Sequence, residues 1–483
     1  MKYLIDWLKQ NWFYILFIAL AAFFVTAVMV ILKDPIGQAI GVCLGAIVFL
    51  LPILLKNPEF GLALVGFFLP FERFPSIDLG GLNVKINYIL ILIVLLVYIF
   101  VKGVRGELKI PRDPIRFFVF LFLALYTISF AGALNQSRAI QVWLSVVLMV
   151  LATFTVTLIA QDEKAIKMTV KGILWGGATV GLIGLYQFMG DMAGLPNSVT
   201  LLKAGYDKGT FGFARVQAVS EEPLYFANYI FIPALISLIL LLRDKVSEVF
   251  SRFSATLLII ILLTDFVLAL SRGAILAAGI VFVLILIFQA KKIFRAKVLF
   301  TAFMISALVL TGAYLALVKS EPRAISEFVD QLTVKKKDTE SVVLRLTTSS
   351  QAMDMFKDKP IFGVGPGNFG PASQGNPTTK PEVIGWRVVN NVYLEVLAES
   401  GVVGFGAFML MILVIFIRSI LAYVKAKDDF LKALVLGLTL AFMAILIQYA
   451  TFSPIYVFHF WFLIGLVSAV SNVIFDKLKN DSE

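Results

Sequence analysis

Apolar segments about 20 residues long follow one another along most of the chain, and this feature constrains the fold more than any other. A helix of about 20 apolar residues crosses the roughly 30 Å of hydrocarbon in a bilayer. With 60% hydrophobic and only 15% charged residues, the chain is far from the composition of a soluble domain. We therefore expect an all-α polytopic membrane protein, and exclude a soluble enzyme, a disordered chain and a fibrous repeat.

The apolar segments predict about 12–14 transmembrane helices. The segment at 58–71 is short and ends at Pro70, so it is a candidate re-entrant segment. The first segment is too long for a cleavable signal peptide, and no small-residue cleavage site follows it. The expected spans are 12–32, 37–55, 58–71, 87–101, 117–134, 139–160, 171–190, 224–242, 253–270, 273–290, 298–318, 392–417, 430–450 and 453–475.

The distribution of lysine and arginine predicts the orientation. With the N-terminus in the cytoplasm, the inner segments hold 24 of the 42 Lys and Arg residues, the short outer segments hold 8, and the long outer segment at about 319–391 holds 10. Cytoplasmic loops are enriched in Lys and Arg, and long loops are exempt from this bias. We therefore expect both termini in the cytoplasm and the 319–391 loop outside it. The net charge of +11 reflects this orientation rather than a nucleic-acid partner.

The 319–391 loop is expected to be partly helical. Mostly apolar residues at steps of four and three predict a helix lying on the membrane surface, and residues 325–332 suggest a shorter one before it. The residues that define the longer helix are Val342, Leu346, Ser349, Met353 and Phe356.

A cluster of glycine and proline follows that helix, in Pro360-Ile-Phe-Gly-Val-Gly-Pro-Gly-Asn-Phe369. Such clusters mark turns, so the helix is expected to end here. Gly363, Gly365 and Gly367 have a spacing like that of a nucleotide-binding loop, but they follow no strand. A dinucleotide site is therefore not expected.

Three arginines on the predicted outer side are candidates for binding phosphate, because charges beside membrane spans are costly and a guanidinium presents a fork of donors. Arg215 lies in the outer segment 191–223, Arg272 follows Ser271 in a very tight turn between two spans, and Arg345 lies on the predicted surface helix. The alternatives are a solvated loop with a local ion pair for Arg215, snorkelling to lipid headgroups for Arg272, and plain solvation for Arg345. Asp265, two helical turns before Arg272, is expected to be a buried partner for an arginine. Arg323 and Arg387 are weaker candidates, and the lysine run at 335–337 is expected to be a solvated or headgroup-facing patch.

Several carboxylates and amides also lie near predicted span ends. Glu221 and Glu222 stand just before a span, where a carboxylate can be partly desolvated. Asn391, Glu395 and Glu399 are spaced by four and share one helix face, with helix capping as the alternative role.

The single histidine, His459, lies among aromatic residues and is expected to be packed and hydrogen-bonded. No cluster has metal-ligand spacing, so we expect no metal and no other cofactor.

Three motifs in this order resemble those of the O-antigen ligase and polymerase superfamily of bacterial membrane proteins, which carry an O-antigen ligase-related domain. The resemblance is specific over about 210–415 and architectural elsewhere. The motifs are Ser271-Arg-Gly-Ala274, Pro360-Ile-Phe-Gly-Val-Gly-Pro-Gly-Asn-Phe369 and Asn391-Val-Tyr-Leu-Glu-Val-Leu-Ala-Glu-Ser-Gly-Val-Val-Gly404.

The resemblance implies a glycosyltransferase in the bacterial cytoplasmic (inner) membrane. It would move a glycan from undecaprenyl diphosphate to a hydroxyl of lipid A core, a growing polysaccharide or a protein, on the outer side and without a metal. Arg215 and Arg272, with Arg345, would bind the diphosphate and stabilise its leaving charge.

The chain departs from the ligases at one position. Asn390 stands where they have a histidine before the Asn-x-Tyr-Leu run, and asparagine cannot accept a proton at neutral pH. Either a carboxylate serves as the base, with Glu222 and Glu399 the best candidates, or the reaction depends mainly on its leaving group. This departure favours a polysaccharide polymerase over a ligase.

Two other classes of protein have a similar sequence pattern. A transporter or flippase of lipid-linked glycans has as many spans, and a non-catalytic scaffold of an envelope assembly complex cannot be told apart by composition. The predicted organisation is an N-terminal set of transmembrane helices at 1–210, a ligase-like core at 211–418 that contains the loop, and C-terminal helices and a tail at 419–483.

Overall fold

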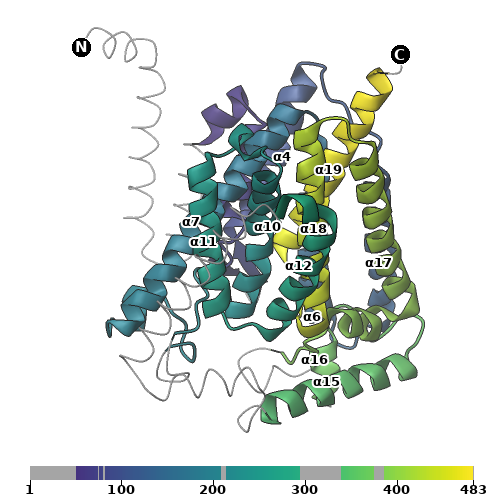
Figure 1. Cartoon of the computed structure of the whole chain (residues 1–483). Helices are drawn as coiled ribbons and strands as arrows, with labels where there is room; N and C mark the ends of the chain where they lie inside the picture. Colours follow the sequence, from purple (N-terminus) through teal and green to yellow (C-terminus); the bar gives the residue numbers. More distant parts are fainter. Residues whose placement is uncertain are drawn as a thin grey trace, which may run out of the picture.

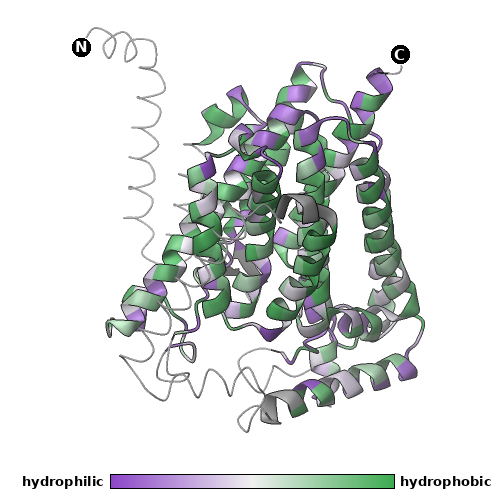
Figure 2. Cartoon of the chain, in the orientation of Figure 1, coloured by the Kyte–Doolittle hydropathy of each residue, from purple (hydrophilic) through white to green (hydrophobic). Residues whose placement is uncertain are grey.

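The computed structural model describes residues 50–73, 76–79, 82–207, 214–293, 339–374 and 386–481, and it confirms the all-α polytopic membrane fold. Within these ranges, eight helices are long and apolar enough to cross a membrane. They form a bundle whose flanks are mainly apolar, with polar residues concentrated toward its two ends (Figures 1 and 2). The spans predicted at 12–32 and 298–318, and most of 37–55, lie outside the described residues.

The main helices of the bundle follow the predicted spans. Three short 3-10 helices, η1 (Ser129–Gly132), η2 (Val246–Glu248) and η3 (Tyr449–Thr451), and the short helix α8 (Asn197–Thr200) lie between them. The main helices are α4 (Ile86–Val104), α5 (Pro114–Ile128), α6 (Gln136–Ile159), α7 (Glu163–Met192), α10 (Pro223–Leu242), α11 (Arg252–Leu268), α12 (Arg272–Ile293), α17 (Val392–Lys425), α18 (Asp429–Gln448) and α19 (Phe458–Asn480).

The segment predicted as the third span does not cross the bundle as one helix. Its helix α3 (Phe60–Phe68) has 9 residues, which at about 1.5 Å per residue is too short to span a bilayer. After a turn, β1 (Ser76–Leu79) and β2 (Leu82–Lys85) form an antiparallel hairpin that leads directly into α4. The alternating runs at 76–79 and 82–85, with Gly80-Gly81 between them in the sequence, were a hairpin signal that the prediction of long apolar spans did not use. The short α3 agrees with a re-entrant segment.

Polar caps begin most of the bundle helices. The side-chain oxygen of Asn135 accepts from the Arg138 N–H at 3.0 Å, and that of Asp162 accepts from the Ala165 N–H at 2.7 Å. These bonds satisfy backbone donors that have no partner inside the helix. The other capped helices begin after Asp113, Ser251, Asn391 and Asp428.

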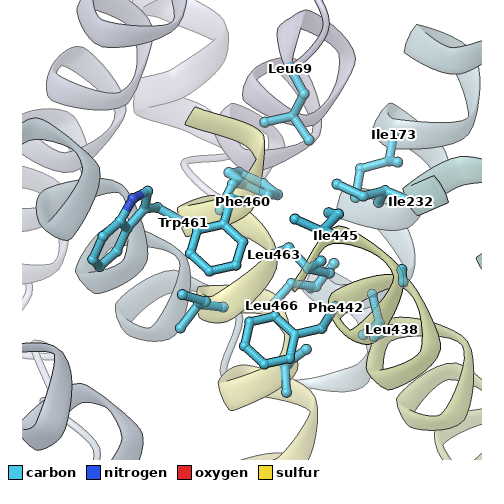
Figure 3. Packing of buried hydrophobic residues seen from close by; sticks show 14 of the residues in the cluster. Leu69, Ile173, Ile232, Leu438, Phe442, Ile445, Phe460, Trp461, Leu463 and Leu466 are labelled. Carbon is cyan, nitrogen blue, oxygen red and sulfur yellow. The ribbon is translucent and has the colours of Figure 1, made fainter. Parts of the chain in front are cut away.

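The core of the bundle is built around α18 and α19. Every residue of α19 from Phe458 to Ile474 is buried, so this helix has no lipid-facing side along most of its length. Phe442 of α18 stacks on Phe460 of α19 with ring centroids 5.6 Å apart, next to Trp461 (Figure 3). A helix that is buried all round fixes the positions of the helices that surround it.

Helix α15 (Thr339–Asp358) lies across one end of the bundle, as predicted for the surface helix (Figure 1). We call this end the α15 face. The Thr348 hydroxyl on the bundle side of α15 donates to the Val389 carbonyl at 3.1 Å, which ties α15 to the residues that precede α17. The short helix α16 (Phe369–Ser373) lies between them in the chain. The helix suggested at 325–332 falls outside the described residues.

Helix α17 breaks near its start, at Gly401. This residue has φ 63° and ψ −167°, so the helix changes direction there. The chain at 360–363 packs into the break, where the Val402 N–H donates to the Pro360 carbonyl at 2.8 Å. A Cβ on Gly401 would lie 2.6 Å from the Phe362 nitrogen. Glycine is therefore required for both its backbone angles and its small size.

The Gly401→Ala variant is expected to lower the free energy of unfolding by at least about 1–2 kcal/mol, the cost of a left-handed residue with a Cβ. Gly406→Ala is the matched control, because Gly406 lies in regular α17 with open space around it, and alanine there should be neutral or add about 0.5–1 kcal/mol. Titration with SDS in mixed micelles measures both. Equal stability of the two variants would contradict the role given to the break.

Candidate active site

Three arginines predicted to bind phosphate come together at the α15 face, although they are far apart in the sequence. Arg215 precedes α10, Arg272 begins α12 and Arg345 lies on α15. Burial lowers the pKa of Arg215; Tyr206 and Glu222 act against this, and the positive charges of Arg272 and Arg345 lower it further. The three guanidinium groups therefore act on one another and concentrate positive charge in one place. We call Arg215, Arg272 and Arg345 the arginine cluster.

Arg215 is held by the turn that joins α11 to α12. Its guanidinium donates to the carbonyl of Ala269 at 3.1 Å and to that of Leu270 at 3.3 Å. Leu270 is in the left-handed region at φ 48°, so the chain reverses within very few residues, and Arg272 follows at once. The hydrogen bonds of Arg215 thus fix two members of the cluster relative to each other.

The loop that carries Arg215 is buried inside the bundle. Of residues 214–220, only Arg215 is not fully buried. Gln187 of α7 accepts from the Ala218 N–H and donates to the Ala218 carbonyl, each at 2.8 Å. Irregular backbone at membrane depth is tolerated only where protein groups satisfy it. A glutamine inside the predicted 171–190 span was the sequence signal for this loop.

Glu221 and Glu222 are neighbours in the chain, but their side chains contact different residues. Glu222 accepts a hydrogen bond from Tyr206, and burial together with this carboxylate raises the pKa of Tyr206 to about 12. Glu222 therefore stands beside Arg215. Glu221 instead forms an ion pair with Lys85 at 3.5 Å.

Glu399 holds the glycine-rich loop at 360–369. Its two carboxylate oxygens accept from the Gly367 N–H at 2.8 Å and the Phe369 N–H at 3.1 Å. Gly363 and Gly365, at φ 67° and 97°, allow the loop to lie against the α17 backbone. These contacts favour an anchoring role for Glu399. The carboxylate that stands with the arginine cluster is Glu222.

The amides before α17 have structural contacts of their own. Asn391 caps the helix by accepting from the Leu394 N–H at 3.2 Å. Asn390, in the position where ligases have histidine, is in the left-handed region at φ 58°, which asparagine tolerates better than most residues. Glu395, one turn into α17, is buried near Arg138.

Asp265 does not have the arginine partner that its position suggested, as far as the described residues go. Its carboxylate is fully buried between α11 and α7, close to the positions of Gly181 and Gly184. Neither oxygen has a hydrogen-bond partner within the described ranges. Asp265 thus packs against a glycine-lined stretch of α7.

Sequence reasoning missed a second group of polar residues at the α15 face, around a cavity of about 270 Å³. Glu72, Lys85, Arg138 and Tyr456 line it. Lys85 and Arg138 lie at the outer ends of predicted spans but in none of the motifs, and the position of Glu72 becomes clear only once the short α3 is known. The position of each residue near a span end was the available signal, but nothing in the sequence connects them.

His459 is packed and hydrogen-bonded, as predicted, and it links the two groups. Its Nδ1 lies 3.6 Å from Glu72, at the cavity. On its other side, hydrogen bonds lead to Ser271, which precedes Arg272. The contacts are His459 Nε2 with Asn228 Oδ1 at 2.8 Å, Asn228 with Gln448 at 2.9 Å, and Gln448 with Ser271 at 3.4 Å.

Comparison with known families identifies part of the chain. Residues 255–409 match the family model described as O-Antigen ligase, and this segment runs from α11 through the break in α17. The chain carries an O-antigen ligase domain. The match confirms the resemblance to the ligase and polymerase superfamily, and with it a multi-pass membrane glycosyltransferase of this general type.

The O-antigen ligase domain contains Arg272, Arg345 and the Glu399 anchor, whereas Arg215 and Glu222 precede it. The arginine cluster and its neighbouring carboxylate thus include residues of a loop that lies outside the matched segment. No curated protein matches the chain.

Proposed function

We propose that this protein transfers a glycan from undecaprenyl diphosphate to a hydroxyl acceptor, at the outer face of the bacterial cytoplasmic membrane. In this proposal the α15 face is the outer face, and both termini are cytoplasmic. The observation that carries it is the convergence of Arg215, Arg272 and Arg345, which three separate segments bring together.

The arginine cluster suits a diphosphate in charge and geometry. Within the part of the chain that the structure describes, Glu222 is the carboxylate that acts on Arg215, so the three guanidinium groups leave an excess of positive charge. Arginine binds phosphate oxygens with parallel hydrogen bonds, and such bonds are stronger than neutral ones. Arg272 and Arg345 have exposed side chains, so a lipid-linked ligand can reach them. The proposal needs no metal, because the guanidinium groups supply the charge.

The proposed reaction is one displacement. An acceptor hydroxyl attacks the anomeric carbon of the first donor sugar, and the bond from that carbon to the diphosphate oxygen breaks. Undecaprenyl diphosphate leaves with the bonding electrons, and the arginine cluster stabilises the negative charge that develops. Glu222 accepts the proton of the hydroxyl.

A polysaccharide polymerase is the preferred form of this activity. Asn390 cannot supply the proton acceptor that the ligases place there, and its left-handed backbone fits an asparagine before the Asn391 cap. We therefore propose that the acceptor is a growing glycan, with a lipid or protein acceptor as the alternative.

The full chain in liposomes, given an undecaprenyl-diphosphate glycan and candidate acceptors, is expected to form a transfer product identified by mass. Longer glycans indicate a polymerase, and a lipid or protein conjugate indicates a ligase.

Arg215→Lys and Arg272→Lys keep the charge but lose the planar fork, so the transfer rate should fall at least about tenfold. Arg252→Lys, at the opposite end of α11, is the control and should keep full rate. Full rates in both site variants, or no transfer by the wild type, would contradict the proposal.

Glu222→Gln and Glu399→Gln are expected to fail in different ways. Glu222→Gln should lower the transfer rate by about 10²-fold or more, because the amide cannot accept a proton. The free energy of unfolding should change little, since the amide oxygen still accepts the hydrogen bond from Tyr206. In Glu399→Gln, an amide NH2 group replaces one carboxylate oxygen, so one backbone N–H of the loop loses its acceptor. The free energy of unfolding should therefore fall by about 1–3 kcal/mol. Transfer rates and SDS titrations separate the two effects. Full activity in both variants would exclude a carboxylate base at these positions.

A further inference from the structure

The cavity at the α15 face lies between the beginnings of four helices. Lys85 precedes α4, Arg138 is in the first turn of α6, Tyr225 is in the first turn of α10, and Tyr456 precedes α19. Its volume of about 270 Å³ is close to the lower end of small-molecule pockets, which begin near 300 Å³. This size suits a single ring rather than a chain of sugars.

The charges that line the cavity balance one another. Lys85 and Arg138 are the cations, and Glu72 and Glu221 are the anions. This differs from the arginine cluster, where positive charge is in excess. A balanced lining gives no net attraction to a phosphate, but it offers both strong donors and strong acceptors to a ligand with many hydroxyl groups.

Two polar atoms around the cavity have no partner within the described ranges. Glu72 is 3% exposed, and its Oε2 accepts no hydrogen bond there, although Oε1 lies near His459. Nε of Arg138 is likewise without a partner, while another nitrogen of this guanidinium donates to the Tyr456 hydroxyl at 3.3 Å. Buried polar atoms without partners are costly, so a ligand that pairs with them would bind favourably.

Aromatic rings complete the lining. Tyr88, Tyr225 and Tyr456 all border the cavity. A tyrosine offers an apolar ring face together with a polar hydroxyl. Sugar rings have the matching property, with C–H groups on their faces and hydroxyls at their edges.

The cavity is adjacent to the proposed reaction centre. Glu221 faces the cavity and Glu222 faces the arginine cluster, so consecutive residues of one buried loop border both places. A sugar joined to a diphosphate, or an acceptor sugar attacking it, must lie next to the leaving group. The network from Glu72 through His459 to Ser271 joins the same two places.

We propose that this cavity binds one neutral sugar ring of the glycan, next to the diphosphate held by the arginine cluster. The inference rests on the proposed function and adds to it a specificity site whose residues lie outside the matched ligase segment, apart from Val388. Glu72 and Glu221 accept hydrogen bonds from ring hydroxyls, and Arg138 and Lys85 donate to ring oxygens. The ring belongs either to the donor or to the acceptor.

The test uses the full chain in nanodiscs and the double variant Lys85→Gln/Glu221→Gln, which removes one ion pair without changing the net charge. Lys427→Gln/Asp481→Gln removes a pair at the opposite end of the bundle and is the matched control. Saturation-transfer NMR measures binding of the methyl glycosides of glucose, galactose and N-acetylglucosamine, with methyl glucuronide for comparison. Farnesyl diphosphate reports separately on the arginine cluster.

We expect the wild type and the control to bind at least one neutral glycoside more tightly than the glucuronide. The cavity variant should bind it at least tenfold more weakly, with farnesyl diphosphate affinity unchanged within twofold. If the double variant does not fold, Gln141→Ala, which alters the lining without breaking an ion pair, should weaken glycoside binding several-fold. Absence of neutral glycoside binding, or equal binding in the cavity variants, would overturn the inference.

The same measurements separate this inference from the proposed function. A wild type that binds glycosides but not farnesyl diphosphate contradicts the diphosphate site and leaves the sugar site standing. In the transfer assay, a higher KM for the donor in the cavity variant assigns the ring to the donor. A higher KM for the acceptor assigns it to the acceptor, and an unchanged KM for both contradicts the inference.

Discussion

The buried carboxylate of Glu399 connects the parts of the α15 face to one another. It accepts hydrogen bonds from the glycine-rich loop, which packs into the break in α17. Beyond that loop, Asn368 accepts from the Asn135 N–H at 2.5 Å, at the cap of α6, and α6 carries Arg138 into the cavity. The same loop follows α15, which carries Arg345. The glycine-rich motif at 360–369 and the motif at 391–404 therefore pack together as one unit, in which the loop is bonded to the carboxylate of Glu399.

Charge is divided between two places at the α15 face, and we propose that they bind different parts of the substrate. Excess positive charge at Arg215, Arg272 and Arg345 suits a diphosphate, whereas the balanced lining of the cavity suits a neutral ring. The consecutive residues Glu221 and Glu222 mark the boundary between them. Because the loop that carries both is buried and bonded to Gln187, the spacing between the two places is fixed by the bundle.

The sequence allowed the helices to be predicted well, because lipid imposes a length and a composition on each span. α4, α6, α10 and α19 all begin within a few residues of the expected positions. Arg215 and Arg272 were candidates because charge beside a span is costly, and Arg345 because it lies on the predicted surface helix. The hairpin before α4 was not predicted, although its strand residues alternate polar and apolar on either side of Gly80-Gly81. These short runs lie between two long apolar segments, which dominate the hydropathy pattern. The cavity could not be predicted, because Glu72, Lys85, Arg138 and Tyr456 meet only through packing of distant helices.

The most direct test of this account is a cryo-electron-microscopy structure of the full chain with an undecaprenyl-diphosphate disaccharide and an inactive Glu222→Gln site. The account predicts the diphosphate against Arg215 and Arg272, with a sugar ring within hydrogen-bond distance of Glu72 or Arg138. A diphosphate bound elsewhere on the bundle, with the arginine cluster unchanged from the unliganded state, would contradict it.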